Sequence, residues 1–151
     1  MEKRPCPTCN QKFDYTKAGK TYCSYRCRKR AYRQRVYEKN EGNWEWFFKG
    51  LINSREDRKD LSPEILIDIL KKQNYKCALS GVKMTCYRKY HDSDLSSTWT
   101  NASIDRIKAG EEYNSKNVQL VCRAVNSFRG TLPVKKYLQW CKKIVEHNKV
   151  N

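Results

Sequence analysis

Two polar residues in the C-terminal half have types and spacing that could bind a divalent metal ion. Asp105 lies inside a short strand, "SIDRI", and Asn126 lies on a helix expected over about 123–129, after a second strand, "VQLVC". A strand–loop–strand–helix order can place a strand carboxylate opposite a helix amide. Two such oxygens, completed by water and phosphate oxygens, suit Mg²⁺, which keeps much of its hydration. The alternative is a polar pair that caps the hairpin against the helix.

An ion held there could polarise a scissile phosphodiester and stabilise the leaving alkoxide. Arg106 and Arg129 flank the pair in sequence and could clamp phosphate oxygens. Arg106 cannot act as a general base, because a guanidinium stays protonated at any working pH. The sequence therefore predicts a phosphate-binding metal site whose base must come from elsewhere.

His91 is the first candidate for that base, since an imidazole titrates near neutral pH. It lies in the polar loop "TCYRKYHDSDLSSTWTNAS", which is expected to cross near the hairpin. The alternative is an exposed loop histidine. His147, near the chain end, is expected to face solvent, and Tyr87 and Tyr90 are weaker candidates.

Four of the eight cysteines form two close pairs near the start of the chain. A C-x-x-C is followed, after thirteen residues, by a C-x-x-x-C; the four are Cys6, Cys9, Cys23 and Cys27. Two pairs joined by a hairpin-sized spacer suit a tetrahedral zinc ion with four sulfur ligands. The alternative is four unligated thiols.

A basic helix is expected directly after the second cysteine pair. Ser24 is suited to be its N-cap, which puts Cys27 in the first turn. Arg26, Arg30 and Arg33 share one face, with Lys29 beside them, and such a ridge is suited to phosphate contacts. A solvated basic face without a ligand is the alternative. On another stripe, the side chains Tyr25, Tyr32 and Val36 are expected to pack.

The charge of the chain points to a polyanionic partner. The 151 residues carry a formal net charge of +16, with 32% charged and 38% hydrophobic residues. Each phosphate neutralised by Lys or Arg releases counterions, so nucleic acid is favoured over an anionic membrane, for which the basic stretches lack an apolar face. The sequence shows no transmembrane run and no secretory signal, so a reducing compartment and thiolate cysteines are expected.

The remaining helices are expected to be scaffold. The cluster Trp44, Trp46, Phe47 and Phe48 is typical of a core rather than of a base-stacking platform. Ser62 and Pro63 should begin a helix with the buried stripe Leu66, Ile69 and Leu70. A last helix should begin after Pro133 and pack through Val134, Leu138, Cys141 and Val145.

Two segments resemble known families. Residues 6–35 are similar to small four-cysteine zinc modules that end in "YCSxxCRxRAYRxR" and often precede DNA-acting domains. From about Gln73 to Leu132, through "CALSG", "ASIDRI", "NVQLVC" and "N-x-x-R", the chain resembles the HNH, or ββα-metal, nuclease family. By this resemblance Asp105 and Asn126 are the metal ligands, and Asn117 is the central asparagine that pins the loop.

The chain departs from the HNH pattern at two places. Members with C-x-x-C pairs on both sides hold a second zinc, whereas this chain has Cys77 with Ser80 and Cys122 with Val125. Cys77 and Cys122 are therefore expected to be buried, small and apolar. Arg106 stands where the family has its general-base histidine, although the resemblance includes a branch with "SxDRI".

Together these features predict an α+β protein with a zinc module and basic helix (1–38), an aromatic connector (39–60) and an HNH-like domain with flanking helices (61–151). The expected function is a metal-dependent DNA endonuclease or nickase that uses Zn²⁺ for structure and Mg²⁺ or another divalent ion for catalysis. The alternative is a catalytically inactive HNH-fold DNA-binding or regulatory protein. RNA is a further possible substrate, and the resemblance implies the cytoplasm of a bacterial or phage-infected cell.

Overall fold

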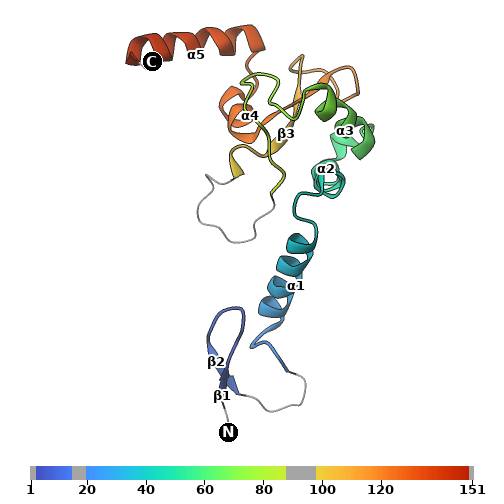
Figure 1. Cartoon of the computed structure of the whole chain (residues 1–151), viewed down its shortest axis with the longest axis vertical. Helices are drawn as coiled ribbons and strands as arrows, with labels where there is room; N and C mark the ends of the chain where they lie inside the picture. The colour runs from blue at the N-terminus through green and yellow to red at the C-terminus, as the bar shows by residue number, and fades with distance from the viewer. Residues whose placement is uncertain (1–2, 15–19, 88–97, 150–151) are drawn as a thin grey trace. The chain divides into compact units, whose positions relative to one another are not determined.

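The computed structural model describes residues 3–14, 20–87 and 98–149 and is an α+β protein (Figure 1). The described residues form two compact units: unit 1 contains 3–14 and 20–41, and unit 2 contains 42–87 and 98–149. The expected boundary at residue 38 thus lies close to the end of unit 1. The expected connector, 39–60, contributes most of its residues to unit 2.

Unit 1 begins with a hairpin in which β1 (Lys3–Pro5) pairs antiparallel with β2 (Lys12–Asp14). The turn between them closes where the backbone N–H of Asn10 donates to the Cys6 carbonyl at 2.8 Å. Asn10 has a φ of 60°, a left-handed conformation that asparagine tolerates better than most residues. The turn therefore holds the first cysteine pair in a tight bend.

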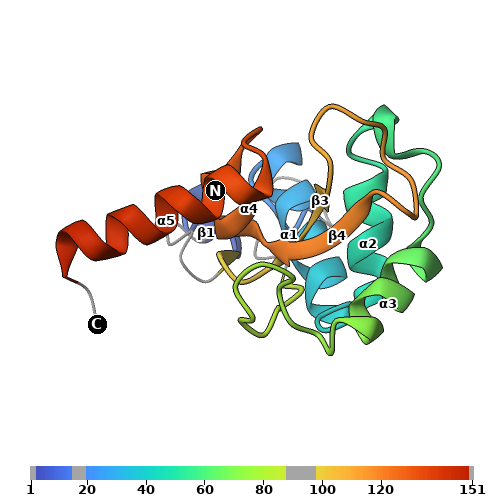
Figure 2. The ribbon, with the colours of Figure 1, turned by 90° about the horizontal axis from the view of Figure 1, so that it is seen from above.

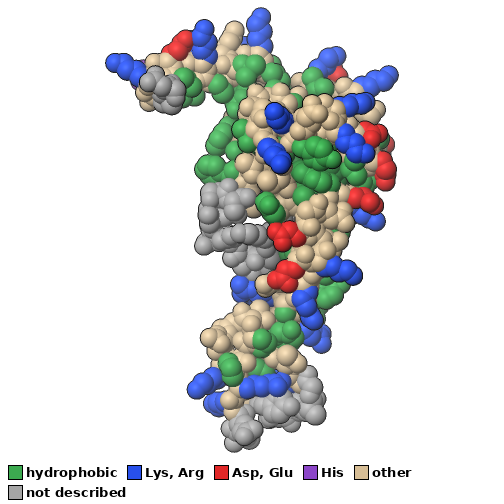
Figure 3. Space-filling model, in the orientation of Figure 1, with side chains coloured by type: hydrophobic (Ala, Val, Ile, Leu, Met, Phe, Trp, Pro, Cys, Tyr) green, Lys and Arg blue, Asp and Glu red, His purple; other side chains and the backbone are tan. Residues whose placement is uncertain are grey.

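Helix α1 (Tyr25–Lys39) completes unit 1. Its start is the predicted one, because the Ser24 side chain accepts a hydrogen bond from the Cys27 N–H at 3.2 Å. Cys27 is its only buried residue. The helix carries seven basic residues and one acidic residue. It therefore presents a solvated, strongly positive surface, along which Lys and Arg side chains stand out (Figure 3).

The core of unit 2 forms between the helices α2 (Trp44–Ile52) and α3 (Pro63–Lys72) and a second hairpin. Phe47 and Phe48 of α2 are buried, with ring centroids 5.9 Å apart, which confirms the aromatic cluster as core. A short 3-10 helix, η1 (Glu56–Arg58), links the two helices. Helix α3 begins as predicted, with Ser62 as N-cap and Pro63 in the first turn.

The second hairpin pairs β3 (Ala102–Arg106) with β4 (Val118–Cys122), and α4 (Arg123–Arg129) follows without a break. The register sets Asp105 opposite Gln119. Because consecutive strand residues point to opposite faces, Ser103 and Asp105 face α4 while Ile104 enters the core. In this β–β–α unit α4 packs against both strands of the hairpin (Figure 2).

The last helix, α5 (Val134–Asn148), differs from the prediction. It has no buried residue, and Leu138, Ile144 and Val145 are each about half exposed. The helix extends away from the rest of unit 2, beyond the end of α4 (Figures 1 and 2). Of the predicted stripe, Val134 and Cys141 are half-buried, whereas Leu138 and Val145 are about half exposed, so α5 packs less closely than the expected scaffold helix. Among the described residues no helix is long and apolar enough to cross a membrane.

Candidate functional site

The four N-terminal cysteines meet between the β1–β2 turn and the start of α1. Cys6 and Cys9 come from the turn, and Cys23 and Cys27 lie just before and inside the first turn of the helix. Thr8 links the β1–β2 turn to α1, because its hydroxyl donates a hydrogen bond to the Cys27 carbonyl at 3.2 Å. All four sulfur atoms lie within 4.8 Å of one another.

The sulfur positions fit a four-coordinate metal ion such as zinc. The Cys23 sulfur lies 3.5 Å from that of Cys9 and 3.5 Å from that of Cys27, too far for a disulfide. A tetrahedral ion with bonds of about 2.3 Å would hold its sulfur ligands about 3.8 Å apart. The cluster therefore has close to the spacing that a metal requires.

The electrostatics of the cluster favour a bound cation. Burial alone would raise the pKa of the Cys6 thiol, but backbone hydrogen bonds at Cys23, Thr8 and Cys9 outweigh it and lower this pKa to about 6. Side-chain hydrogen bonds with Cys27 and Cys9 raise the pKa of Cys23 to about 12. The hydrogen bonds that favour one thiolate thus favour the protonated form of its neighbour. A divalent cation would allow the sulfur atoms to bind as thiolates.

The basic residues expected to contact phosphate occupy one side of α1. Arg26 and Lys29 are exposed, whereas Arg30 and Arg33 are half-buried. Arg30 also lines a shallow hollow that includes Thr8, Gln34 and Glu38. Arg26 and Lys29 are thus the more accessible part of the predicted ridge.

Asp105 is buried between the hairpin and α4, and both of its carboxylate oxygens have partners. Its Oδ1 accepts a hydrogen bond from Nη2 of Arg129 at 2.5 Å, and its Oδ2 accepts one from Nε2 of Gln119 at 2.8 Å. The side chains of Asp105 and Arg129 are only 3% and 2% exposed. The pair is therefore a buried ion pair, in which Arg129 supplies the positive charge that a buried carboxylate needs.

Asn126 binds β3 at a different point from Asp105. Its Nδ2 donates to Oγ of Ser103 at 2.7 Å and approaches the Ile104 carbonyl at 3.4 Å. No described contact joins it to Asp105. Both residues thus make polar contacts between hairpin and helix, as the structural alternative supposed, but each has its own partners.

The atoms around Asp105 include oxygen donors of the types that bind a hard cation. A carboxylate and the amide oxygens of Asn126 and Gln119 are ligands that Mg²⁺ accepts. Oδ1 of Asp105 faces a guanidinium, so an ion could use only Oδ2. For that, the Gln119 amide must give up its hydrogen bond or turn its oxygen toward the ion. The donor types are therefore those of a divalent-ion site, but in this structure both Asp105 oxygens are taken by protein partners and no described contact brings Asn126 to them.

The two flanking arginines do not lie where the phosphate-clamp prediction put them. The Arg106 guanidinium stacks on the Tyr113 ring, 4.9 Å from its centroid, and Nη1 donates to the Glu111 carbonyl at 3.1 Å. Arg129 is buried and holds Asp105 as well as the Arg106 and Leu132 carbonyls. Arg129 cannot reach a nucleic-acid phosphate from this position, so its prediction as a nucleic-acid contact is wrong. Arg106 lies next to Asp105 in sequence but points elsewhere, because consecutive strand residues face opposite sides.

Asn117 fixes the loop between the two strands. Its Oδ1 accepts from the Lys108 N–H at 2.9 Å, and its Nδ2 donates to the Glu112 carbonyl at 3.0 Å. The side chain is buried. This is the loop-pinning arrangement expected from the central asparagine.

The candidate bases are only partly described. His91 and Tyr90 lie outside the described residues. Tyr87 is 41% exposed, and its backbone is held by the buried amide of Asn101 through bonds of 2.9 and 2.6 Å. His147 is exposed on α5, as expected.

Cys77 and Cys122 are buried in the core of unit 2, as expected. Each is 3% exposed, and the Ser80 N–H donates to the Cys77 sulfur at 3.4 Å. Burial and the neighbouring Cys77 raise the pKa of Cys122 to about 11. This thiol therefore behaves as an apolar core group.

Sequence reasoning missed Gln119 and Ser103, the two hairpin residues that hold Asp105 and Asn126. Ser103 lies two residues before Asp105 on β3, and Gln119 lies directly opposite Asp105 on β4. The alternation of side chains along β3 puts Ser103 on the same face as Asp105, but the pairing of residue 105 with residue 119 requires the strand register, which the sequence does not give. Gln73 was missed for the same reason. Its side-chain amide donates to the Leu120 carbonyl at 2.8 Å and accepts from the Leu120 N–H at 3.0 Å.

The chain was compared with known proteins at three levels. No family model, no curated protein and no solved structure matches it.

Proposed function

We propose that this protein is a metal-dependent endonuclease or nickase that acts on double-stranded DNA. The observation that supports the proposal is the β3–β4–α4 unit, in which a buried strand carboxylate, Asp105, and a helix amide, Asn126, both make polar contacts between the hairpin and the helix, in a segment that resembles the HNH motif. The net charge of +16 supports a phosphate-bearing substrate.

In this proposal the residues of unit 2 bind the metal ion and orient its ligands. A divalent ion, when bound, would polarise the scissile phosphodiester and stabilise the leaving oxygen. Asp105 and Asn126 offer oxygen ligands, and Gln119 and Arg129 orient the Asp105 carboxylate. Asn117 keeps the loop over 107–117 in place. His91 is the proposed base.

Unit 1 supports the proposal as a DNA-holding element. The four-cysteine cluster suits a structural zinc ion, which would fix the start of α1. The exposed side chains of Arg26 and Lys29, with Arg30 and Arg33 beside them, are placed on α1 to contact phosphates. Such contacts provide affinity and not sequence specificity.

A plasmid assay tests the proposal. The full chain is incubated with supercoiled DNA in Mg²⁺, in Mn²⁺ and in EDTA, with an RNA of matched length in a parallel series. We expect conversion to nicked or linear DNA in at least one metal and none in EDTA. No cleavage under any condition, with DNA binding intact, contradicts hydrolysis.

Asn126→Ala is the variant of choice, because it removes a half-buried amide without leaving a buried charge. We expect it to lower cleavage at least about 100-fold while DNA affinity stays within about two-fold. Ser127→Ala, at an exposed position on the same helix, is the matched control and should cleave normally.

A second candidate is a DNA-binding or regulatory protein with the same fold and no turnover. It is favoured by one observation: both oxygens of Asp105 already have protein partners, one of them a guanidinium. Under this candidate Asn126→Ala changes nothing in the plasmid assay, and DNA affinity depends on unit 1 alone.

A further inference from the structure

Two tyrosines on α1 are exposed where the sequence predicts packing. Tyr25 is 67% exposed and Tyr32 is 62% exposed, whereas Val36 on the same stripe is half-buried. Tyrosine usually covers its ring and leaves only the hydroxyl in water. Two rings with two-thirds of their surface in water, one above the other on a helix, are therefore a surface feature that needs a partner.

Arginines alternate with these rings. Tyr25, Arg28, Tyr32 and Arg35 follow at spacings of three, four and three, which places them on one face of α1, here called the Tyr–Arg stripe. Seven residues separate the two tyrosines, so they lie about 10 Å apart along the helix axis. The stripe is distinct from the ridge of Arg26, Arg30 and Arg33, which lies about a third of a turn away.

Positive charge lies close to the first ring. The Arg28 guanidinium carbon lies 5.3 Å from the Tyr25 ring centroid, and the Lys29 ammonium nitrogen lies 5.8 Å from it. Both cations lie over the ring, so a base that stacks on Tyr25 would take the place of one of them, and the displaced cation would be close enough to pair with the phosphate of the same nucleotide.

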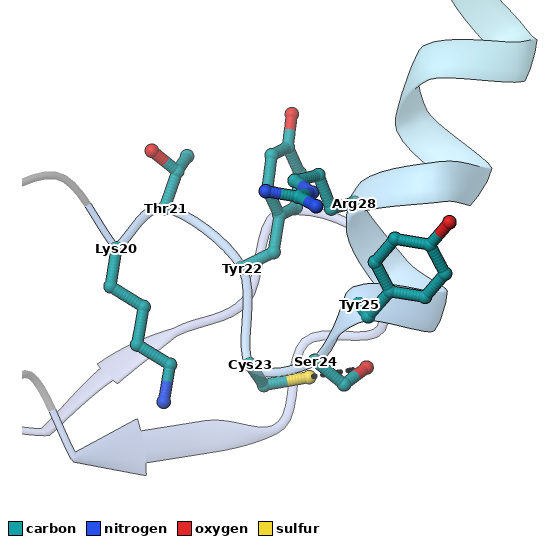
Figure 4. A pocket seen from close by; sticks show the side chains of 7 residues that line it. All are labelled: Lys20, Thr21, Tyr22, Cys23, Ser24, Tyr25 and Arg28. Carbon is teal, nitrogen blue, oxygen red and sulfur yellow. Dashed lines mark hydrogen bonds between the residues drawn. The ribbon is translucent and has the colours of Figure 1, made fainter.

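The stripe begins at a hollow of about 500 Å³ (Figure 4). Its lining combines two cationic side chains, two aromatic rings and hydroxyl groups: Lys20, Thr21, Tyr22, Ser24, Tyr25 and Arg28, with Cys23 at the bottom. In the close view Tyr22 and Arg28 project to the same side of the segment, and Tyr25 projects from the first turn of α1. Basic and aromatic groups gathered around one hollow are the kinds of group that contact the phosphate and the base of a nucleotide.

We infer that the Tyr–Arg stripe and its hollow bind unpaired nucleotides, with bases stacked on Tyr25 and Tyr32 and phosphates held by Arg28 and Arg35. Stacking needs a free base face, and a duplex buries those faces in its own stack. Basic side chains interleaved with exposed aromatic rings are the pattern of single-strand binding, whereas the Arg26 ridge lacks rings and suits a duplex backbone. The inference depends on the proposed function only in taking nucleic acid as the ligand.

Fluorescence anisotropy with a labelled 20-nucleotide single strand and the same sequence as duplex tests the inference over a salt series. The double variant Tyr25→Leu/Tyr32→Leu should lose about 30-fold or more in single-strand affinity, which corresponds to two stacks at the lower measured strength. Its duplex affinity should change less than three-fold, and its salt dependence should not change.

Three further variants separate stacking from folding and from charge. Tyr25→Phe/Tyr32→Phe keeps the rings and should bind as the parent does. Arg28→Gln should reduce the slope of log affinity against log salt by about 0.7 for the single strand. Trp140→Leu removes an aromatic ring that is 57% exposed on α5 and should have no effect.

The inference is overturned if the leucine variant loses single strand and duplex equally, or loses neither. Tighter binding to vesicles with an anionic lipid than to the oligonucleotide also overturns it, because the stripe would then serve a membrane surface. Tyrosine-dependent single-strand binding without plasmid cleavage would leave the inference standing and remove the nuclease proposal.

Discussion

At the scale of single residues, the central fact is that Asp105 and Arg129 form a buried pair. A carboxylate that is 3% exposed needs a positive partner or several donors, and here it has Arg129 and Gln119. Arg129 in turn donates from Nη1 and Nη2 to two backbone carbonyls, while its Nε is buried without a hydrogen-bond partner among the described residues. The pair therefore locks α4 onto the hairpin, whatever else the site does.

Removing one member of this pair should be costly. We expect Arg129→Met to lower the free energy of unfolding of unit 2 by about 3–5 kcal/mol, because it leaves the Asp105 charge buried and without a cation. The double variant Asp105→Leu/Arg129→Met should lose less than the sum of the single variants, since it leaves no lone charge. Urea unfolding followed by circular dichroism measures both.

The exposed pair of Arg55 and Asp57 is the control for this prediction. Its atoms also approach to 2.6 Å, but the side chains are 52% and 44% exposed. Asp57→Ala should therefore cost less than about 1 kcal/mol. Equal losses at the two pairs, or strictly additive losses at Asp105 and Arg129, would refute the account of a coupled buried pair.

At the scale of elements, the side chain of Asn117 provides hydrogen bonds to backbone groups of the loop over 107–117, which strands obtain from their neighbours. It satisfies one backbone donor and one backbone acceptor on the far side of the loop. Asn117→Ala should lower the stability of unit 2 by about 1–3 kcal/mol, because buried backbone groups lose their partner. It should also speed proteolysis within the loop. Ser115→Ala, exposed in the same loop, should do neither.

Two amphipathic helices of similar pattern differ in what they bury. Leu66 on α3 is fully buried, whereas Ile144 on α5 is 57% exposed. Leu66→Ala should therefore cost about 2–5 kcal/mol, while Ile144→Ala should cost less than about 1 kcal/mol. Thermal unfolding of both variants checks this contrast. A comparable loss at Ile144 would mean that α5 is covered in solution.

At the scale of the whole molecule, the chain contains two compact units with different sources of stability. Unit 2 has a hydrophobic core of buried side chains. In unit 1 the only buried hydrophobic residues among those described are Cys6 and Cys27, two of the four clustered cysteines. Units this small that have no apolar core are commonly stabilised by a metal, and the clustered cysteines of unit 1 suit one.

Metal removal should therefore separate the two units. A strong chelator should abolish the helical signal of α1 and weaken nucleic-acid binding, while unit 2 keeps its cooperative unfolding transition. Cys6→Ser should lower the zinc content from about one ion per chain, and Cys141→Ser, outside the cluster, should not. Zinc content unchanged by Cys6→Ser would show that the cluster is not the metal site.

Features that depend on local spacing could be predicted from the sequence. The cysteine pairs, the N-caps at Ser24 and Ser62, and the hairpin followed by a helix follow from residues close together in the chain, whereas the loop-pinning role of Asn117 was implied by the resemblance to the HNH family. Each of these is confirmed in the structure. Local rules suffice there because turns, caps and short loops are stabilised by neighbours in sequence.

The partners of polar groups far apart in the chain became known from the folded structure. It paired Asp105 with Arg129 and Gln119, directed Arg106 to Tyr113, and left Tyr25, Tyr32 and part of the stripe of α5 exposed. The physical reason is that strand register and helix rotation set these partners, and a shift of one residue in either would exchange them. Exposure likewise depends on what packs against a face, which the pattern of that face alone does not contain.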